Sequence, residues 1–499
     1  MKHAGLFATK PVDDYRREAE GKHLVRALGI PALITFGIGG IIGTGIFVLT
    51  GLAAAQHAGP AIVISFVLAG IGCMFAGLCY SEFAAMVPVS GSAYAYSYAT
   101  LGELTAWFVG WNLVLEYMMA SSVVAVGWSS YAVKLLQDLG VSFLPAKLTS
   151  APFATLTADS LQLHATGAWF NLPAVFIVVM ATALCYKGIR ESAIVNTIIV
   201  LIKISIVVAV IVFGAAYIHL GYWAPYIPKN TGTYGQFGWS GISQAAAIIF
   251  FAYIGFDGVS TVAQEAKNPA RGMPIGILGS LAICTVLYVL MSAVLTGLVP
   301  YTQLNDAAPV ATALEAHPQL LWLTLWVEVG ALLGLTSVII TLIIPQARIW
   351  LTMARDGLMP RAFGAVHPRF HTPHVSTLIT GGLAAVIGGL LPIDILGELV
   401  SIGTLVAFIV VCLGVLILRY TRPDLPRPFR APAVWFTSLM GVGFCGWMAY
   451  SLPNATWWRL LLWSLLGFAL YFLYGYRHSR LRQPGGDTAG AASAVSPTT

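Results

Sequence analysis

Residues Gly37 to Phe47 read GIGGIIGTGIF, and they lie within a run that carries no charged residue from Ala27 to Gln56. Five of the nine residues from Gly37 to Gly45 are glycine, and each glycine costs a helix interior about 1 kcal/mol relative to alanine. As straight helix the uncharged run would measure roughly 45 Å, against a hydrocarbon core of about 30 Å. Irregular backbone at membrane depth is tolerated only where it lines a cavity or is buried in protein. We therefore predict a membrane span that is broken at its glycines and presents backbone groups to a bound solute.

The same glycines allow a simpler interpretation. Gly39 and Gly43 form a G-x-x-x-G pair, and such pairs often do nothing more than let two membrane helices pack closely. A second interrupted span at the matching place of an inverted repeat favours a binding site instead. A binding site also requires a cavity between the two interrupted spans.

The composition is that of a membrane protein. Of the 499 residues, 58% are hydrophobic and 9% are charged, and the mean hydropathy is +0.81, whereas a soluble domain is about one-quarter charged. The polar, basic N-terminus and the long apolar run after it predict no cleavable signal. The six cysteines lie in apolar runs without C-x-x-C spacing, which predicts core packing instead of disulfides or metal ligands.

The apolar runs predict an all-α polytopic protein with twelve transmembrane helices. Their expected ranges are residues 31–56, 60–86, 101–136, 167–186, 191–218, 239–262, 274–299, 321–353, 374–391, 395–419, 432–452 and 456–476. With the N-terminus in the cytoplasm, 21 of the 26 Lys and Arg residues fall on the inner side, as the positive-inside rule requires. An even number of spans then places both termini in the cytoplasm. This bias accounts for the net charge of +6 without a nucleic-acid partner.

The spans group into a repeat. Residues 31–218 hold spans one to five and residues 239–419 hold spans six to ten, and the odd number inverts the second block in the membrane. The sixth span carries FFAYIGFDG at Phe250 to Gly258, where Gly255, Asp257 and Gly258 interrupt an apolar run. The rest of the chain is predicted to form a cytoplasmic N-terminal segment (1–30), two extra helices (432–476) and a disordered cytoplasmic tail (483–499). Residues 138–166 and 300–319 are expected to be outer loops.

Several motifs together resemble the amino acid/polyamine/organocation superfamily, and within it the bacterial members of the cationic amino acid transporter family. The resemblance covers about residues 25 to 478. It rests on GIGGIIGTGIF, on FFAYIGFDG, and on the patches Ser81-Glu82-Phe83, Gly91-Ser92-Ala93-Tyr94, Glu265-Ala266-Lys267-Asn268-Pro269 and Ala354-Arg355-Asp356-Gly357. It implies a five-plus-five inverted-repeat fold with two extra helices, and secondary amino acid transport by alternating access.

A zwitterion in such a site needs partners for both charges. Amides at the N-terminus of a half-helix can bind a carboxylate, and carbonyls at a half-helix C-terminus can bind an ammonium. The resemblance places the substrate against Ile41, Gly43, Thr44 and Gly45 on the carboxylate side, and against Phe251, Ala252 and Ile254 on the ammonium side, with Phe256 closing over it. The alternatives are a Thr44 hydroxyl bonded to its own helix and phenylalanines that only pack in the core.

Lys203 lies twelve residues after Glu191 in the fifth span, about 18 Å deep by helical rise, where inserting lysine costs about 2.5 to 3.5 kcal/mol. Thr44 lies at a similar depth, so carbonyls of the broken first span could receive the ammonium. Resemblance to proton-coupled members of the fold assigns Lys203 to proton coupling, and a permanently charged structural cation is the alternative.

Two further carboxylates have alternative roles. Glu116 in the third span could pair with Lys203, help to bind a cationic side chain, or be a protonated structural hydrogen bonder. Asp257 could handle protons, although the N-cap of the inner half-helix is the favoured role.

Four more carboxylates lie towards the ends of spans. Glu82 and Glu265 are expected to latch the inner gate, and Glu328 and Glu398 to be solvated or interfacial.

Other protein classes fit less well. The chain has no G-x-x-x-x-G-K-[ST] motif, so an ATP-driven pump would need a partner subunit. An intramembrane aspartyl hydrolase needs two carboxylates that share a proton, and Asp394, the second carboxylate available beside Asp257, falls in a short outer turn. A channel is a further alternative, but two half-helices suit a binding site better than a continuous pore.

The sequence therefore predicts a transporter and not an enzyme, importing L-amino acids into the cell across the inner (plasma) membrane by proton symport. The expected partners are substrate, protons and membrane lipid, without a cofactor or metal ion. An exchanger with little proton coupling and a uniporter for cationic amino acids (Arg, Lys or ornithine) are alternatives. Ile41, Phe251 and Phe256 make the expected pocket mostly apolar, which favours small and medium neutral amino acids.

Overall fold

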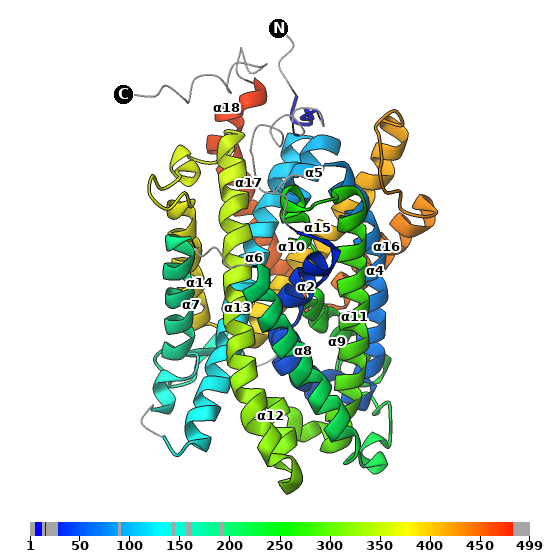
Figure 1. Cartoon of the computed structure of the whole chain (residues 1–499), viewed down its shortest axis with the longest axis vertical. Coiled ribbons are helices and arrows are strands. Elements are labelled where there is room, and N and C mark those ends of the chain that lie inside the picture. The colour runs from blue at the N-terminus through cyan, green and yellow to red at the C-terminus, as the bar shows by residue number, and fades with distance from the viewer. Residues whose placement is uncertain are drawn as a thin grey trace.

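The computed structural model describes residues 5–11, 15, 28–87, 91–141, 145–155, 162–188 and 193–482. The predicted tail and most of the predicted N-terminal segment lie outside these residues. The described chain forms an elongated bundle of helices (Figure 1). All six cysteines are buried and free, as predicted.

Long helices make up most of the bundle. They are α4 (Ile62–Met86), α6 (Glu103–Asp138), α7 (Leu172–Lys187), α8 (Ala193–Ala215), α11 (Pro269–Leu298), α13 (Leu321–Arg355), α14 (His374–Leu390), α15 (Ile393–Thr421), α16 (Val434–Ser451) and α17 (Asn454–Leu470). Within the described residues, eight helical stretches are long and apolar enough to cross a membrane, and three apolar helices are shorter. The chain is therefore a multi-pass membrane protein. The number twelve stays a prediction, because one such stretch, Gly45–Met86, continues through two predicted spans.

Both spans predicted to be interrupted are broken. The first consists of α2 (Ile30–Ile41), a π-helical turn at Gly45–Leu49 and α3 (Thr50–Ala53). The sixth consists of α9 (Gly238–Ile249), a 3₁₀ turn at Phe250–Tyr253 and α10 (Gly258–Thr261). The first break contains Gly43 and the sixth contains Gly255, and glycine lowers helix propensity, so the predicted interruption of both spans is confirmed.

Short elements occupy segments that were expected to be loops. The segment 138–166 contains a hairpin of β1 (Phe153–Thr155) and β2 (Leu163–Ala165), paired antiparallel. The segment 300–319 contains α12 (Pro309–Glu315). A further short helix, α5 (Ser92–Thr100), joins α4 to α6. Their polar composition made these segments look irregular, but a proline at the first helical turn and β-prone residues were enough to order them.

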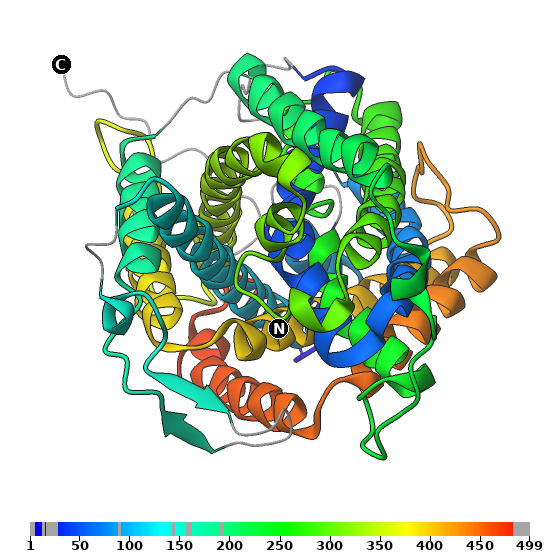
Figure 2. The same ribbon diagram turned by 90° about the horizontal axis from the view of Figure 1, so that it is seen from below.

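The packing places the broken spans inside the bundle. The α6 helix contacts both α13 and α15, and α2 lies against α8 and α11. Viewed along the long axis, α7 and α14 form one edge of the bundle and α16 lies on the opposite side (Figure 2). Because longer helices surround α2 and α10, the irregular backbone of both breaks is shielded from lipid, as its unpaired polar groups require.

The two ends of the bundle differ. The terminal end carries residues 5–11 and α18 (Tyr476–His478), and the α12 end carries α12 and the β-hairpin (Figure 1). At the terminal end, Asp356 pairs with Lys10 at 3.0 Å and accepts a hydrogen bond from the Tyr94 hydroxyl at 2.8 Å. Burial raises the pKa of Tyr94, which keeps this hydroxyl a neutral donor.

The C-terminal segment is fastened to the same end through Glu103, the first residue of α6. Glu103 is fully buried. It accepts hydrogen bonds from the hydroxyls of Tyr471 at 2.8 Å and Ser479, and it pairs with Arg482 at 3.1 Å. Both described chain ends are therefore part of the packed structure.

Candidate functional site

A cavity of about 10 Å³, room for about one water molecule in this conformation, lies between the two breaks. It is lined by Gly40, Ile41, Gly43, Thr44, Gly45, Ala120, Val124, Phe251, Ile254, Val338 and Leu342. Six of the eight predicted substrate residues are in this set. The five lining residues that sequence reasoning did not single out are Gly40 and four apolar residues of α6 and α13. These four look like ordinary core residues in sequence, so no signal in the chain could have found them.

The break in the first span exposes Gly43 and Thr44 to the cavity. Helix α2 ends with Ile42 in an extended conformation (φ −73°, ψ 100°). A Cβ atom on Gly43 would meet only the Val338 side chain at 3.4 Å. The Thr44 hydroxyl is fully buried and has no hydrogen-bond partner among the described residues. The alternative of a hydroxyl satisfied by its own helix is therefore wrong, and a buried hydroxyl without a partner is available to a ligand.

Close packing explains other glycines of the same run. A Cβ atom on Gly45 would lie 2.4 Å from the Cα of Ala252. One on Gly37 would lie 2.5 Å from the Ser280 hydroxyl oxygen. Close packing thus occurs at Gly37 and Gly45, outside the Gly39–Gly43 pair for which it was considered. Gly43 faces the cavity, and Gly45 lines it as well.

The break in the sixth span touches the first through backbone atoms. Ile254 is extended (φ −63°, ψ 137°), and Gly255 has φ +123°, a conformation that only glycine adopts at low cost. A Cβ on Gly255 would lie 2.6 Å from the carbonyl carbon of Gly40. Glycine at both positions therefore lets the two interrupted spans meet.

Tyr288 on α11 joins the two breaks, and sequence reasoning missed it. Its hydroxyl oxygen lies 2.7 Å from the Ile41 carbonyl and 2.8 Å from the Ala252 carbonyl. The hydroxyl has one hydrogen, so it donates to one carbonyl at a time. A tyrosine within an apolar helix carries no sequence signal of such a role.

Lys203 on α8 is fully buried and holds the first break. Its ammonium donates to the carbonyls of Gly39 at 2.9 Å and Ile42 at 3.2 Å. Gly334 on α13 leaves room for its stem, because a Cβ there would lie 3.0 Å from the Lys203 Cε. The predicted contact between this ammonium and the first span is present.

Glu116 on α6 is fully buried, and neither carboxylate oxygen has a hydrogen-bond partner among the described residues. It is therefore not hydrogen-bonded to Lys203 in this conformation. It also does not line the cavity. A buried carboxylate without donors is stable only as the neutral acid or beside a cation.

Asp257 does not cap α10 with its side chain, so the favoured N-cap role is wrong. Its carboxylate instead accepts a hydrogen bond from the Tyr117 hydroxyl at 2.5 Å and from the Gly255 amide at 3.2 Å. The residue thus stabilises the extended turn of the sixth span and ties it to α6.

Two predicted substrate residues lie beside the cavity without lining it. Phe256 is fully buried, and its ring packs on Tyr80 and Phe408 with centroids 5.8 and 5.1 Å away. The Ala252 carbonyl lies within hydrogen-bond distance of the Tyr288 hydroxyl, and Gly45 packs closely against the Cα atom of Ala252. In this conformation neither residue is placed to contact a solute in the cavity.

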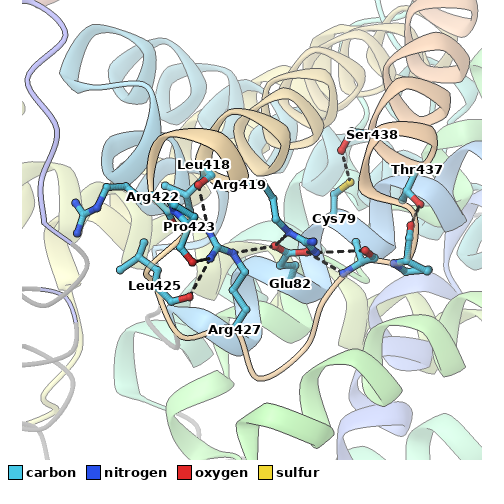
Figure 3. A network of polar contacts seen from close by, with 12 residues as sticks. Cys79, Glu82, Leu418, Arg419, Arg422, Pro423, Leu425, Arg427, Thr437 and Ser438 are labelled. Carbon is cyan, nitrogen blue, oxygen red and sulfur yellow. Dashed lines mark hydrogen bonds and ion pairs between the residues drawn. The ribbon is translucent and has the colours of Figure 1, made fainter.

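Glu82, at the terminal end of α4, is enclosed by arginines (Figure 3). Arg419 of α15 donates to both of its oxygens, at 2.8 and 2.6 Å, and the Ala431 amide donates at 2.8 Å. Arg427 lies 3.4 Å away. The carboxylate thereby joins α4, α15 and the segment before α16.

Two of the remaining predicted carboxylates are buried. Glu328 is 0% exposed and Glu398 is 5% exposed, so neither is solvated, and an interfacial position stays a prediction for both. Glu398 is stabilised by the Thr456 hydroxyl at 2.6 Å and Arg459 at 3.1 Å. Glu265 is partly exposed, and its carbonyl accepts a hydrogen bond from the Leu28 amide.

Comparison with known proteins supplies the family. A model of the amino acid permease family matches residues 28–471. The chain belongs to this family. It is a transporter of the amino acid/polyamine/organocation superfamily and not an enzyme, as the motifs predicted.

Relatives of this amino acid permease differ in the substrate that their names give. The chain is 45% identical to the branched-chain amino acid permease BcaP of Bacillus subtilis, over 96% of this chain and 99% of the relative. It is 44% identical to the methylthioribose transporter of the same organism, over 96% and 100%. Cationic amino acid transporter 3 of Arabidopsis thaliana is 37% identical over 85% of this chain and 68% of the relative.

Proposed function

We propose that this permease imports neutral L-amino acids with apolar side chains, together with protons, by alternating access across the plasma membrane. The observation that carries the proposal is the cavity between two broken spans, which an unpartnered Thr44 hydroxyl and a row of apolar side chains line. The proposal includes twelve spans, the inverted repeat of residues 31–218 and 239–419, and cytoplasmic termini.

The substrate carboxylate would bind at the start of the π-helical turn, next to Gly43, Thr44 and Gly45. The first amides of a helix have no partner within it, and the helix dipole favours an anion there. The ammonium would bind beside Phe251 and Ile254, where the sixth span ends its first half-helix and its carbonyls point towards the break.

An apolar side chain fits the remaining lining. Ala120 and Val124 of α6 and Val338 and Leu342 of α13 face the cavity, and its lining includes no charged residue. Burying the head group of lysine or arginine there would leave a charge unpaired. The names of the two bacterial relatives are consistent with small solutes of moderate polarity. Methylthioribose is the second candidate substrate, because that relative is as similar as BcaP.

Lys203 is proposed to couple protons to transport. When charged, its ammonium holds the carbonyls of Gly39 and Ile42 and keeps the first span broken in the geometry that accepts a carboxylate. When the proton leaves, these hydrogen bonds lose their charge assistance, and the first span is free to change conformation. Glu116 and Asp257 are proposed to accept or relay protons, since both are buried carboxylates between α6 and the sixth span.

Uptake by proteoliposomes tests the proposal. We expect saturable accumulation of labelled leucine or valine when the outside is acidic, with competition by other neutral amino acids and weak competition by lysine. Counterflow without a pH gradient would persist in a carrier. Accumulation that is independent of the pH gradient but requires internal amino acid would indicate an exchanger. Faster transport of methylthioribose than of leucine would identify methylthioribose as the substrate.

A further inference from the structure

Three carboxylates and one lysine meet at the α12 end of the bundle, away from the cavity. Asp138 is the last residue of α6, Glu315 is the last residue of α12 and Glu328 lies in α13. One carboxylate oxygen from each lies within 4.8 Å of the others. Lys134 pairs with Glu315 at 2.7 Å and with Asp138 at 3.7 Å. We call this group the acidic cluster.

Glu328 receives no hydrogen bond from the Lys134 ammonium of the acidic cluster. It is 0% exposed, and neither oxygen has a hydrogen-bond partner among the described residues. Its nearest polar neighbours include another carboxylate, and two ionised carboxylates cannot donate hydrogen bonds to each other. A buried anion in this position needs a cation or a proton.

With all three carboxylates ionised, the acidic cluster has a net negative charge. Three carboxylates contribute −3 and Lys134 contributes +1, which leaves −2. Asp138 also stands at the C-terminus of a 36-residue helix, where the helix dipole is negative and disfavours a carboxylate.

The dimensions suit a hard divalent cation. The centre of a triangle whose sides are at most 4.8 Å lies at most about 2.8 Å from each corner, close to the 2.3–2.6 Å of calcium–oxygen bonds. The side chains of Asp138 and Glu315 are 36% and 29% exposed, so water can supply further ligands. No sulfur or imidazole is in the group, which favours calcium over softer metals.

We propose that Asp138, Glu315 and Glu328 bind a calcium ion, which the sequence prediction of no metal did not foresee. Lys134, whose side chain is 25% exposed, turns into the solvent when the ion binds. The site joins α6 and α13 to α12, the short helix at the α12 end of the bundle (Figure 1). Pro309 of α12 packs on the first span, because a Cβ on Gly51 would lie 2.3 Å from the Pro309 ring. The ion therefore fixes the short helix that covers this end of the first span.

Calcium binding to the purified full-length protein tests the proposal without any transport assay. After dialysis against EDTA, equilibrium dialysis with ⁴⁵CaCl₂ should show one saturable site per chain, half-filled at about 1 mM or below, the range of modest extracellular calcium sites. CaCl₂ should raise the Tm over the same range, and KCl at equal ionic strength should not.

Three variants sharpen the result. Glu328→Gln should weaken calcium binding at least tenfold, while Lys134→Gln should strengthen it because a competing ammonium is removed. Asp394→Asn, at an exposed residue in the first turn of α15, should leave binding unchanged. The proposal is overturned if the unaltered protein binds no calcium saturably, if Lys134→Gln binds none, or if only lower pH raises the Tm. Failure of amino acid uptake would leave these readouts unaffected.

Discussion

The first and the sixth spans are both interrupted, yet different chemistry holds each break. The first break is held by a charge, because the Lys203 ammonium reaches the Gly39 and Ile42 carbonyls. The sixth break is held by hydroxyl and amide donors from Tyr117, Gly255 and Tyr288. The Tyr288 hydroxyl also lies 2.7 Å from the Ile41 carbonyl of the first break. Under the proposed coupling role of Lys203, loss of its proton weakens the charge-assisted support of the first break, so the first span is expected to respond to pH.

Replacing Lys203 by Met should have the largest effect on this difference. It removes two charge-assisted hydrogen bonds, each worth about 1.5–3 kcal/mol, and a loss of about 3 kcal/mol corresponds to ~100-fold in rate or affinity. We expect uptake driven by an acidic exterior to fall by this factor and to lose its dependence on pH. Initial rates of leucine uptake across a series of external pH values provide the measurement.

The control for Lys203→Met is counterflow at equal pH on both sides. Residual counterflow with no response to a pH gradient would support a coupling role. If acid-driven uptake matched that of the unaltered protein, Lys203 would be only a structural cation.

The pair Gly45→Ala and Gly43→Ala separates packing from binding at the first break. A Cβ on Gly45 collides with Ala252 at 2.4 Å, whereas one on Gly43 meets Val338 at 3.4 Å. Overpacking typically costs about 1–3 kcal/mol, so Gly45→Ala should lower the Tm measured by intrinsic fluorescence. Gly43→Ala should keep the Tm and raise the KM for leucine. Equal effects of the two substitutions on the Tm and on the KM would contradict the assignment of Gly45 to packing and Gly43 to binding.

Tyr288→Phe tests the uncharged hydroxyl that lies between the Ile41 and Ala252 carbonyls of the two breaks. Loss of one hydrogen bond is worth about 0.5–1.5 kcal/mol, so we expect a two- to tenfold fall in uptake rate with the pH profile retained. Tyr253→Phe is the matched control, because that hydroxyl donates to the Phe66 carbonyl of α4 instead. A pH profile that shifts in Tyr288→Phe would show that the sixth break also responds to protons.

Thr44→Val should give the smallest effect. It removes a hydroxyl that has no partner among the described residues and keeps the shape of the side chain. We expect about a fivefold rise in KM if the hydroxyl contacts substrate, in line with one hydrogen bond, and no loss of Tm. Thr50→Val, whose hydroxyl donates to the Gly45 carbonyl at 3.0 Å, should show the reverse pattern. An unchanged KM in Thr44→Val would remove this residue from the binding site.

The sequence could locate the breaks because glycine acts through local backbone energetics. Five glycines in nine residues and the GFDG turn lower helix propensity wherever the tertiary structure places them. The depth of Lys203 could also be predicted, since helical rise converts residue number into distance. These are properties of one helix at a time.

The sequence could not show contacts that depend on which helices face each other. Tyr288 and Val338 are ordinary residues of long apolar helices, and only the packing of α11 and α13 brings them to the breaks. The burial of Glu328 was missed for the same reason. Its position near a span end predicted contact with water, but the neighbouring elements exclude that water from the side chain. Asp257 occupies a capping position, yet a tyrosine from α6 holds its carboxylate.

The arginine enclosure of Glu82 has a consequence for how motion in this permease can be measured. Since the carboxylate fastens α4 to α15 and to the chain entering α16, we expect these three pieces to move together while the ion pairs are intact. Spin labels on the terminal ends of α4 and α16 would keep a constant separation while substrate and pH vary. The separation of these two labels can then serve as a reference distance when displacements of α2 are measured.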